Sequence, residues 1–533
     1  MMRRARCVAA AEFAVIVLVV WTRFVGFTEH VDLHAADEIV YYLAGVDLFA
    51  HGTMPSLAWG PLYSFAYGCL ALFPIDGHLP DTMLMLSAGF GSLALWWALR
   101  AVAPSPLAVV AATWYAASPI ILQASAEGPV PGPGVYAFNA IFVFLSFGAM
   151  ARGRVWLAIG MLCLVSLGRA ENLPWLLAFA MCAVLLPSMR ARRRASLGML
   201  ALALAVAAMV AASPDHRDRA WLAFRQSYGQ QACLQELAEE WVRLEGKVDP
   251  ERARFVPFEL QAAFDVPDRW IERDFPGARS VLDALQSNPE PVLAMVSRNL
   301  TVLPFALEYT WSTTFLPRPW SSRVLALATL LAIGGLWQRR RVAGLPPTDV
   351  RSLLPWYLAT SVLVLGVPLF VAARPELGLA TIPLLAWILC RGLASLAPVF
   401  WQRPAIAPST IAVVVALLVA VPGPFRGPAL PMQYRDGLAL LKEHLPPGEV
   451  RLLSAFWDLL MRMVPRTDVV LCPQVASGLP TFAACADACG ANAVLVTMQF
   501  EHQTAQCSDR LTSLQAPPWR LVAQRGEARL YLR

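Results

Sequence analysis

The chain has 533 residues, of which 57% are hydrophobic and only 15% are charged, and its mean hydropathy is +0.53. Soluble domains carry about 25% charged residues, so the composition excludes a string of soluble domains, and most of the chain is expected to face lipid. The formal net charge of +6 is carried by short arginine clusters between apolar runs. Because no basic helix is interleaved with exposed aromatic residues, we expect no nucleic-acid partner.

The hydropathy pattern predicts about eleven membrane-spanning helices, since a span needs about 20 mostly apolar residues and about 17 suffice. The predicted spans are 8–27, 83–99, 107–124, 135–150, 155–167, 173–186, 197–212, 324–337, 354–372, 377–390 and 406–421. Several are short for a full span, which indicates partial helices around a cavity or misplaced ends. The first resembles a signal peptide but lacks a small-residue cleavage site in 21–27, which favours an uncleaved signal anchor.

The arginines predict the orientation of the chain. A cytoplasmic N-terminus puts successive arginine clusters on the cytoplasmic side, as the positive-inside rule requires: Arg100, Arg152, Arg154, 190–194, 339–341, Arg391 and Arg403. Three segments then lie outside, namely 28–82, 213–323 and everything after about residue 422. We expect a multi-pass protein of a bacterial inner membrane with a periplasmic or extracellular C-terminal domain.

Residues 424–533 form a predicted α/β domain that is separate from the membrane domain, 1–423. Strands alternate with helices, which favours a small, largely parallel sheet: helices at 434–444, 456–463 and 481–489, strands at 450–454, 468–472 and 493–497, and a hairpin of 519–524 with 528–532. In an oxidising compartment its four cysteines favour one or two disulfides: Cys472, Cys485, Cys489 and Cys507. Zinc is the rival interpretation, but their spacing matches no zinc ribbon or finger.

Two adjacent carboxylates, Asp37 and Glu38, follow the first span. An aspartate near the centre of the bilayer costs roughly 2.5 to 3.5 kcal/mol, so the pair sits in water or lines a polar site. In the structural interpretation, Asp37 caps a helix over 38–49. In the functional one, a carboxylate at the membrane surface serves as a general base.

Two arginines, Arg169 and Arg374, break the positive-inside pattern, because both fall in short outer loops. Each could pair with a nearby acid, Glu171 or Glu376, or extend to lipid headgroups. Alternatively, each guanidinium grips a lipid phosphate in bidentate geometry. With Asp37 on the same side, the arginines would complete a base and a phosphate clamp, which indicates an enzyme.

These motifs resemble those of a known superfamily. The acidic pair, then Tyr41, Gly52 and the segment 60–63, is similar to the first outer loop of GT-C glycosyltransferases, especially the protein O-mannosyltransferase, aminoarabinose transferase and RgtA/B/C/D-like branch. Residues 169–172 resemble an Arg-x-Glu-Gly/Asn pattern of that branch, and Arg374 with Pro383 resembles a late Arg–Pro pattern. The resemblance covers residues 8 to 425 by topology. No Lys-Gly-Pro segment is present, and Arg374 precedes Pro-Glu instead of an aromatic residue.

The resemblance implies an inverting transfer of a sugar from a polyprenyl-phosphate donor to a hydroxyl of a glycan, lipid or protein acceptor. Asp37 would be the base or a metal ligand, and Glu38 would orient the acceptor or share a divalent ion. Mg or Mn would suit these hard oxygen ligands, and the use of a metal is left open. The remaining site residues are the phosphate-binding Arg169 and Arg374, and the supporting Glu171, Tyr41 and Tyr42.

The outer segment 213–323 is too long for a turn. It contains an acidic, helix-prone run at 231–245, then the segments 250–267 and 268–274, and an apolar stretch, 289–307, that suits the membrane interface. Four tryptophans there could stack on sugar rings or anchor the chain at the interface: Trp241, Trp270, Trp311 and Trp320. Cys233 is either free or paired with the C-terminal domain.

Two other classes of function remain. A secondary transporter also has short, proline-interrupted helices, but its polar residues cluster at the midplane, and the two halves of this sequence show no internal repeat. A non-catalytic assembly protein would merely display the C-terminal domain. Catalysis requires Asp37 and the two arginines to converge on one outward cavity, whereas display does not.

Overall fold

The computed structural model describes residues 2–27, 38–55, 60–73, 79–116, 134–168, 172–185, 193–212, 219–244, 260, 263, 266–311, 323, 326–333, 350–366, 375–396, 409, 412–413, 433–454, 469–472, 482–497, 512–526 and 528–533. Predictions that fall elsewhere, such as the helix at 456–463 and most of the span at 406–421, lie outside the described residues.

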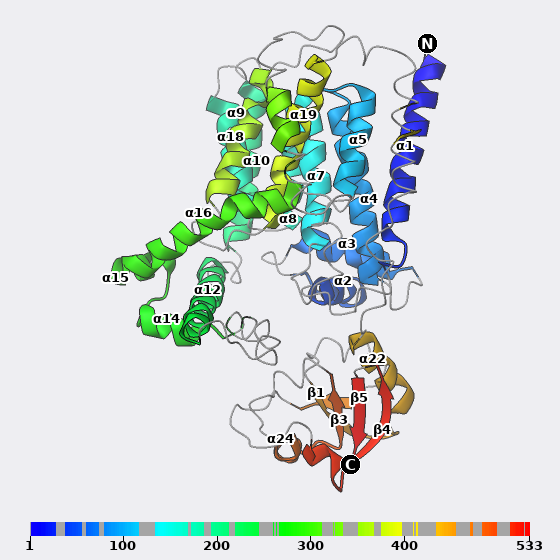
Figure 1. The fold of residues 1–533 in the computed structure, drawn as a ribbon, viewed down its shortest axis with the longest axis vertical. Coiled ribbons are helices and arrows are strands. Elements are labelled where there is room, and N and C mark those ends of the chain that lie inside the picture. The colour runs from blue at the N-terminus through cyan, green and yellow to red at the C-terminus, as the bar shows by residue number, and fades with distance from the viewer. Residues whose placement is uncertain are drawn as a thin grey trace.

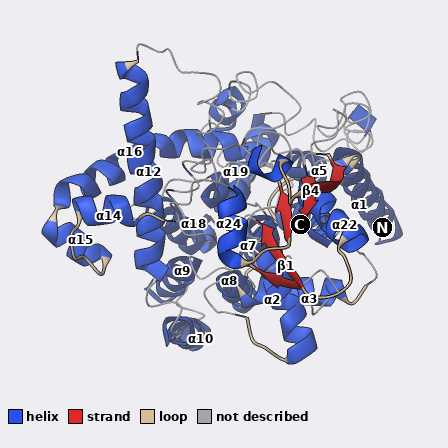
Figure 2. Cartoon of the chain, turned by 90° about the horizontal axis from the view of Figure 1, so that it is seen from below, coloured by secondary structure: helices blue, strands red, loops and turns tan. Residues whose placement is uncertain are grey.

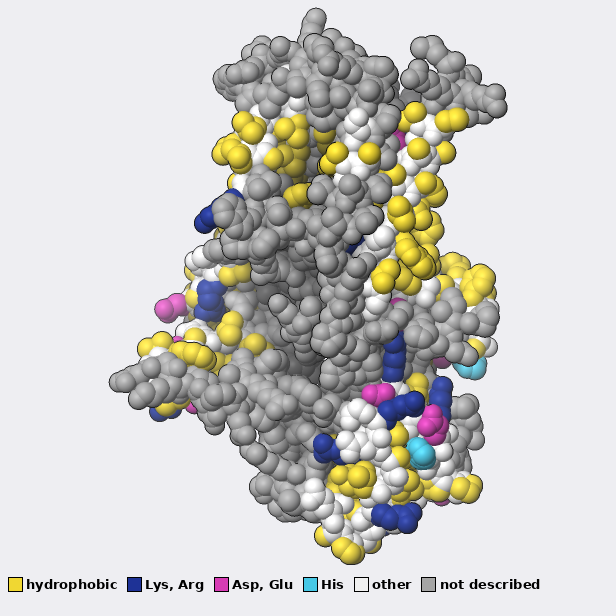
Figure 3. All heavy atoms as spheres, turned by 45° about the vertical axis from the view of Figure 1, so that its right-hand side comes forward, with side chains coloured by type: hydrophobic (Ala, Val, Ile, Leu, Met, Phe, Trp, Pro, Cys, Tyr) yellow, Lys and Arg dark blue, Asp and Glu magenta, His cyan; other side chains and the backbone are white. Residues whose placement is uncertain are grey.

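A helical bundle forms the upper part of the molecule in Figure 1. Its helices are α1 (Met2–Phe24), α4 (Leu79–Leu99), α5 (Ser105–Ala116), α7 (Gly134–Ala151), α8 (Val155–Gly168), α9 (Leu173–Leu185), α10 (Arg193–Ala212), α18 (Val350–Gly366) and α19 (Ile382–Leu396), the last preceded by the 3-10 helix η7 (Pro375–Thr381). One apolar core joins most of these helices, and its members include Phe144, Trp175 and Trp356. Figure 3 shows hydrophobic side chains along the outside of the bundle as well, as expected of helices that face lipid.

Within the described residues, helices long and apolar enough to cross a membrane occur at Cys7–Phe24, Asp81–Leu99, Gly134–Ala151 and Gly378–Ser395. Shorter apolar helices occur at Val155–Gly168, Leu173–Cys182 and Leu200–Met209. The chain is therefore an integral membrane protein. These helices account for part of the predicted set of about eleven spans, and that count is not confirmed.

One end of the bundle carries two of the arginines predicted to be cytoplasmic, Arg100 after α4 and Arg152 after α7. The buried Glu12 of α1 accepts hydrogen bonds from Trp96 Nε1 at 3.0 Å and Ser105 Oγ at 2.5 Å, and Arg100 Nε lies 3.8 Å from it. Arg152, between α7 and α8, donates to the carbonyl oxygen of Trp97 in α4 at 2.6 Å. The ends of α4 and α7 therefore lie at one level, and α1 packs against α4 and α5.

The opposite end carries two helices of the segment predicted as the first outer loop, α2 (Glu38–His51) and α3 (Pro61–Ala71). Both lie at the lower end of the bundle in Figure 1, between the spans and the C-terminal domain. The helix predicted over 38–49 is thereby confirmed, whereas the cap at Asp37 lies outside the described residues.

The segment predicted as the second outer one folds into a small helical unit. It comprises α12 (Arg219–Arg243), α14 (Asp268–Asp274), α15 (Val281–Ser287) and α16 (Pro289–Trp311), and α16 leads from this unit towards the bundle (Figure 1). Its apolar core includes Phe224, Phe275 and the buried Cys233. Trp270 is also buried there and donates to Glu236 at 3.1 Å, so its ring is unavailable for stacking on a sugar.

Asp274 joins α14 to α12 through charge-assisted hydrogen bonds. Arg273 Nε and Nη2 donate to its two carboxylate oxygens at 2.9 and 2.8 Å, and Tyr228 Oη donates to Oδ2 at 2.7 Å. The bond from Arg273 is the main cause that lowers the pKa of Asp274, opposed in part by desolvation. The hydroxyl of Tyr228 is held protonated, because burial and the contact with Asp274 raise its pKa.

The hydrogen bonds to Asp274 predict that the helical unit of α12 to α16 loses stability in acid. Because the pKa of Asp274 is lower in the folded state, its stabilisation is complete above the unfolded value of about 3.9 and is lost as the pH falls through the folded pKa. The melting temperature of the wild type should therefore fall more steeply below about pH 4 than that of Asp274→Asn. Tyr228→Phe should reduce the difference, and parallel pH curves for wild type and Asp274→Asn would contradict the assignment.

The C-terminal domain is a five-stranded sheet of order β2-β1-β3-β5-β4. Its elements are α22 (Gln433–His444), β1 (Val450–Ser454), β2 (Val469–Leu471), α24 (Phe482–Cys489), β3 (Ala493–Val496), η9 (Thr512–Gln515), β4 (Arg520–Arg525) and β5 (Ala528–Leu532). The first three strands in this order are parallel, whereas β5 is antiparallel to both β3 and β4. Two apolar clusters cover the sheet, one with α22 and the other with α24. The predicted strands and the helices at 434–444 and 481–489 are confirmed; Figure 2 shows the sheet from below.

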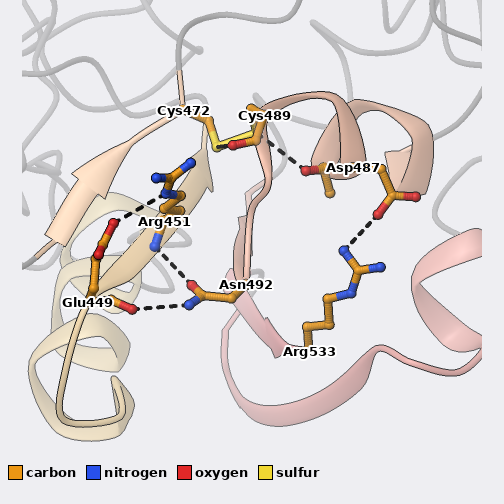
Figure 4. Close-up of a disulfide and its surroundings, with 8 residues drawn as sticks. Glu449, Arg451, Cys472, Asp487, Cys489, Asn492 and Arg533 are labelled. Carbon is orange, nitrogen blue, oxygen red and sulfur yellow. Dashed lines mark hydrogen bonds and ion pairs between the residues drawn. A yellow bond between two sulfur atoms is a disulfide. The ribbon is translucent and has the colours of Figure 1, made fainter.

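A disulfide joins Cys472, after β2, to Cys489, at the end of α24 (Figure 4). Of the other two candidate cysteines, Cys507 and the side chain of Cys485 lie outside the described residues. Nearby, Asn492 accepts from Arg451 N at 2.8 Å and donates to the carbonyl oxygen of Glu449 at 3.1 Å. The disulfide thus ties the edge strand β2 to the helix that covers one face of the sheet.

Replacing both Cys472 and Cys489 by Ser should loosen the C-terminal domain. The bond closes a sequence separation of 17 residues. A loop of that size is worth about 3 kcal/mol in the unfolded-chain entropy model, or roughly a hundredfold in opening equilibrium. Native-state hydrogen exchange of β3 in the full-length protein measures the effect, and unchanged exchange in the double variant would show that the bond contributes no stability.

Candidate active site

Most of the predicted site residues lie outside the described residues: Asp37, Arg169, Glu171 and Arg374. Glu38 begins α2, but its side chain is not among those described. Tyr41 and Tyr42 are described, and so are the elements on either side of each predicted residue. The described geometry therefore concerns the frame of the site: α2, α3, the end of α8 and η7.

A stack of tyrosines joins α2 to α3. The rings of Tyr41 and Tyr63 meet edge to face with centroids 4.9 Å apart, Tyr63 meets Tyr67 at 5.1 Å, and Tyr42 meets Tyr67 at 6.2 Å. Tyr41, Tyr63 and Tyr67 are almost fully buried. Edge-to-face pairs add about 0.5 to 1.5 kcal/mol beyond their buried area. Tyr41 and Tyr42, predicted as supporting residues, therefore fix the first turns of the helix that begins with the acidic residue Glu38.

Glycine allows α2 and α3 to cross at close range. A Cβ at Gly45 would overlap the carbonyl oxygen of Ser64 and approach Gly68 N, and a Cβ at Gly68 would overlap the ring of Phe49. Only a residue without a side chain permits such an approach. The two helices therefore form one tightly packed unit at this end of the bundle.

The first outer loop directly touches the corner that leads to Arg169. Gly60, the N-terminal cap of α3, has φ +84°, and a Cβ there would overlap the carbonyl oxygen of Gly168. Gly168 is the last residue of α8, so the next residue in the chain is Arg169. The structure thus brings the loop containing the acidic pair into contact with the segment containing the first predicted phosphate ligand.

Asn139 adds a polar group at the same corner, and it was not among the residues predicted from the sequence. A Cβ at Gly168 would overlap Asn139 Oδ1, and the side chain of Asn139, in α7, is only 4% exposed. Neither Oδ1 nor Nδ2 has a hydrogen-bond partner in the part of the chain that the structure describes. A buried amide without partners is costly, which makes Asn139 a candidate polar group of the site. A lone asparagine within an apolar span, 135–150, was the available sequence signal.

The second predicted phosphate ligand precedes η7, which packs against α7 and α16. Pro375 opens this 3-10 helix and Pro383 lies in the first turn of α19, where a missing N–H costs no hydrogen bond. Residues after Arg374 therefore contact α7, the helix that carries Asn139.

An ion pair between the membrane domain and the C-terminal domain was also not predicted from the sequence. Arg435 Nη2 of α22 lies 2.7 Å from Asp81 Oδ2 in the first turn of α4, and the Asp81 side chain is completely buried. Asp81 falls inside the segment treated as outer loop, and Arg435 falls inside an ordinary amphipathic helix. Neither position shows a pattern that predicts the pairing.

The described residues contain no cluster of three or more His, Cys, Asp or Glu side chains that could hold a metal ion. The Asp37 and Glu38 side chains lie outside this part of the chain. A Mg or Mn ion on this pair therefore stays a prediction.

No protein-family model matches the sequence, and no curated protein matches it. Among solved structures, the archaeal oligosaccharyltransferase AglB of Archaeoglobus fulgidus, in complex with an inhibitory peptide and a dolichol-phosphate, is similar at 12% identity, with 93% of this chain and 71% of that chain covered and a TM-score of 0.44. The same organism's oligosaccharyltransferase in complex with Zn and sulfate is similar at 13% identity, 93% and 69% coverage and a TM-score of 0.45. ArnT from Cupriavidus metallidurans, bound to undecaprenyl phosphate, is similar at 13% identity, 97% coverage of both chains and a TM-score of 0.42. Since TM-scores this low do not establish a common fold, the activity proposed for this chain rests on its own residues.

Proposed function

We propose that this protein is a membrane glycosyltransferase that moves a sugar from a polyprenyl-phosphate donor to an acceptor hydroxyl at the membrane surface. The observation that carries the proposal is the contact between Gly60 and Gly168. It joins the loop of the acidic pair to the corner of Arg169 at one end of an apolar bundle. A general base and a phosphate-binding cation are the two groups that such a transfer requires.

In the proposed mechanism, Asp37 removes the proton from the acceptor hydroxyl as its oxygen attacks the anomeric carbon of the sugar. The bond from that carbon to the phosphate oxygen breaks, and the lipid phosphate leaves with the electron pair. Arg169 and Arg374 stabilise the charge that develops on this phosphate. A single displacement inverts the anomeric configuration, and Glu38 orients the acceptor.

The α2 helix supports the role of the acidic pair. Glu38 is its first residue and Asp37 immediately precedes it. The N-terminus of a helix carries a partial positive charge that favours the ionised form of a carboxylate. An ionised carboxylate is the form that accepts a proton, so this position suits a base.

The test is transfer of radiolabelled sugar by the purified protein. Polyprenyl-phosphate sugars are offered together with a membrane extract as acceptor, and nucleotide sugars serve as the matched donors that lack a lipid. Transfer from the lipid-linked donor alone supports the proposal. Absence of transfer from all donors, with uptake of labelled solute into proteoliposomes, would instead support a secondary transporter.

A further inference from the structure

We propose that the C-terminal domain clamps α2 against the bundle and thereby positions the acidic pair at the start of this helix. Arg435 and Leu438 of α22 are the positioning residues. The clamp follows from contacts between described residues, whereas its effect on catalysis rests on the glycosyltransfer proposed above.

The apolar half of the clamp is a shared core. Leu43 of α2 is 4% exposed and belongs to the same buried cluster as Leu438 and Leu441 of α22 and Leu452 of β1. Val40 and Tyr42 of α2 pack against this cluster as well. One face of α2 is therefore part of the interior of the C-terminal domain.

The polar half of the clamp is the ion pair between Arg435 and Asp81. Its N–O distance is 2.7 Å, and the side chains are 18% and 0% exposed. Removing one partner leaves a buried charge without compensation, so such a pair resists separation. The next residue of α22, Asp436, lies 3.8 Å from Arg525 of β4, which ties α22 to its own sheet.

The other face of α2 is held by α3, which in turn packs against α4 and α8 of the bundle. Tyr41 stacks on Tyr63, and Gly45 lies in the close crossing with α3. The helix thus lies between two bodies, and Val40, in contact with the C-terminal domain, is only three residues from Asp37. Because a misplacement of about 1 Å can cost about a hundredfold in rate, a shift of α2 is expected to change catalysis.

The experiment compares Arg435→Gln with Arg533→Gln in the full-length protein. Arg533 pairs with Asp487 at 2.7 Å within the C-terminal domain, and both side chains are about half exposed, so its loss leaves the clamp intact. Hydrogen exchange of α2 and of α7 and the rate of sugar transfer are measured for each variant. We expect α2 to exchange faster only in Arg435→Gln. We also expect kcat to fall about tenfold or more with little change in KM for the donor.

A second variant guards against loss of folding. Asp81→Asn combined with Arg435→Gln leaves no unpaired buried charge, so it should regain part of the protection of α2. If α2 keeps wild-type exchange in Arg435→Gln, the clamp is overturned. The clamp is also overturned if α7 loosens as much as α2 in both the single and the double variant.

The effect of the clamp on catalysis is tested separately from the clamp itself. If α2 loosens but kcat stays at the wild-type value, the positioning role is overturned although the clamp stands. If the wild-type protein transfers no sugar, the proposed glycosyltransfer fails together with the positioning role. The exchange data still decide the clamp in that case, because they do not depend on activity.

Discussion

Replacing Asp37 by Asn is expected to lower sugar transfer by about 10²- to 10⁴-fold, the range contributed by a general base. Asparagine keeps the shape of the side chain and its ability to accept a hydrogen bond, but it does not take up the proton of the acceptor hydroxyl. Transfer of radiolabelled sugar from polyprenyl-phosphate donors by purified wild type and variant measures the loss, with equal folding checked by thermal unfolding.

Asp47→Asn is the matched control for this experiment. Asp47 lies in α2, nine residues after Glu38, and it is partly buried. Its replacement removes one carboxylate from the helix that follows Asp37 without touching the proposed base. Equal activity of Asp37→Asn and the wild type would exclude the proposed site, and equal losses in both variants would assign the effect to the helix as a whole.

Among glycine-to-alanine substitutions in the first outer loop, Gly60→Ala should cause the largest loss of stability. Gly60 has φ +84°, and the added Cβ would overlap the carbonyl oxygen of Gly168. Backbone is unable to yield as a flexible side chain does, so α3 must move away from α8. We expect a cost of more than about 4 kcal/mol, or a protein that does not fold, measured by thermal unfolding in detergent.

Gly52→Ala separates the steric overlap from the backbone strain. Gly52 also has a positive φ, +67°, but a Cβ there would meet nothing within 4 Å. Only the left-handed conformation is then penalised, which costs about 1 to 2 kcal/mol. Similar destabilisation by the two variants would mean that Gly60 and Gly168 are not in close contact in the membrane.

The local parts of the fold could be predicted from the sequence because they depend on periodicity and turn residues. The hairpin of β4 and β5 and the amphipathic α22 are examples. Ends of helices were less predictable: the first span was expected to reach residue 27, but α1 ends at Phe24, before Gly26 with φ +82°. Hydropathy measures transfer to lipid and does not register such a backbone break.

The frame of the candidate site could be predicted only in part. The acidic pair and the two arginines stand out because charge is rare in this sequence, and their order and sidedness indicated one outer layer. The contact between Gly60 and Gly168 joins residues without side chains, which leave no pattern of hydrophobicity or charge. Asn139 has a polar side chain, but its neighbours in space come from distant parts of the sequence.

The ion pair of Asp81 with Arg435 joins residues separated by 354 positions. During synthesis the first outer loop therefore leaves the ribosome long before its partner in α22 exists. Until the last spans have been inserted, Asp81 has no arginine from α22, and Leu43 has no sheet to cover it. Completion of this end of the molecule is consequently a late folding event, since contacts between distant segments form only after the chain between them has been ordered. A truncated chain that stops before α22 would contain every proposed catalytic residue and still lack the surface that holds α2.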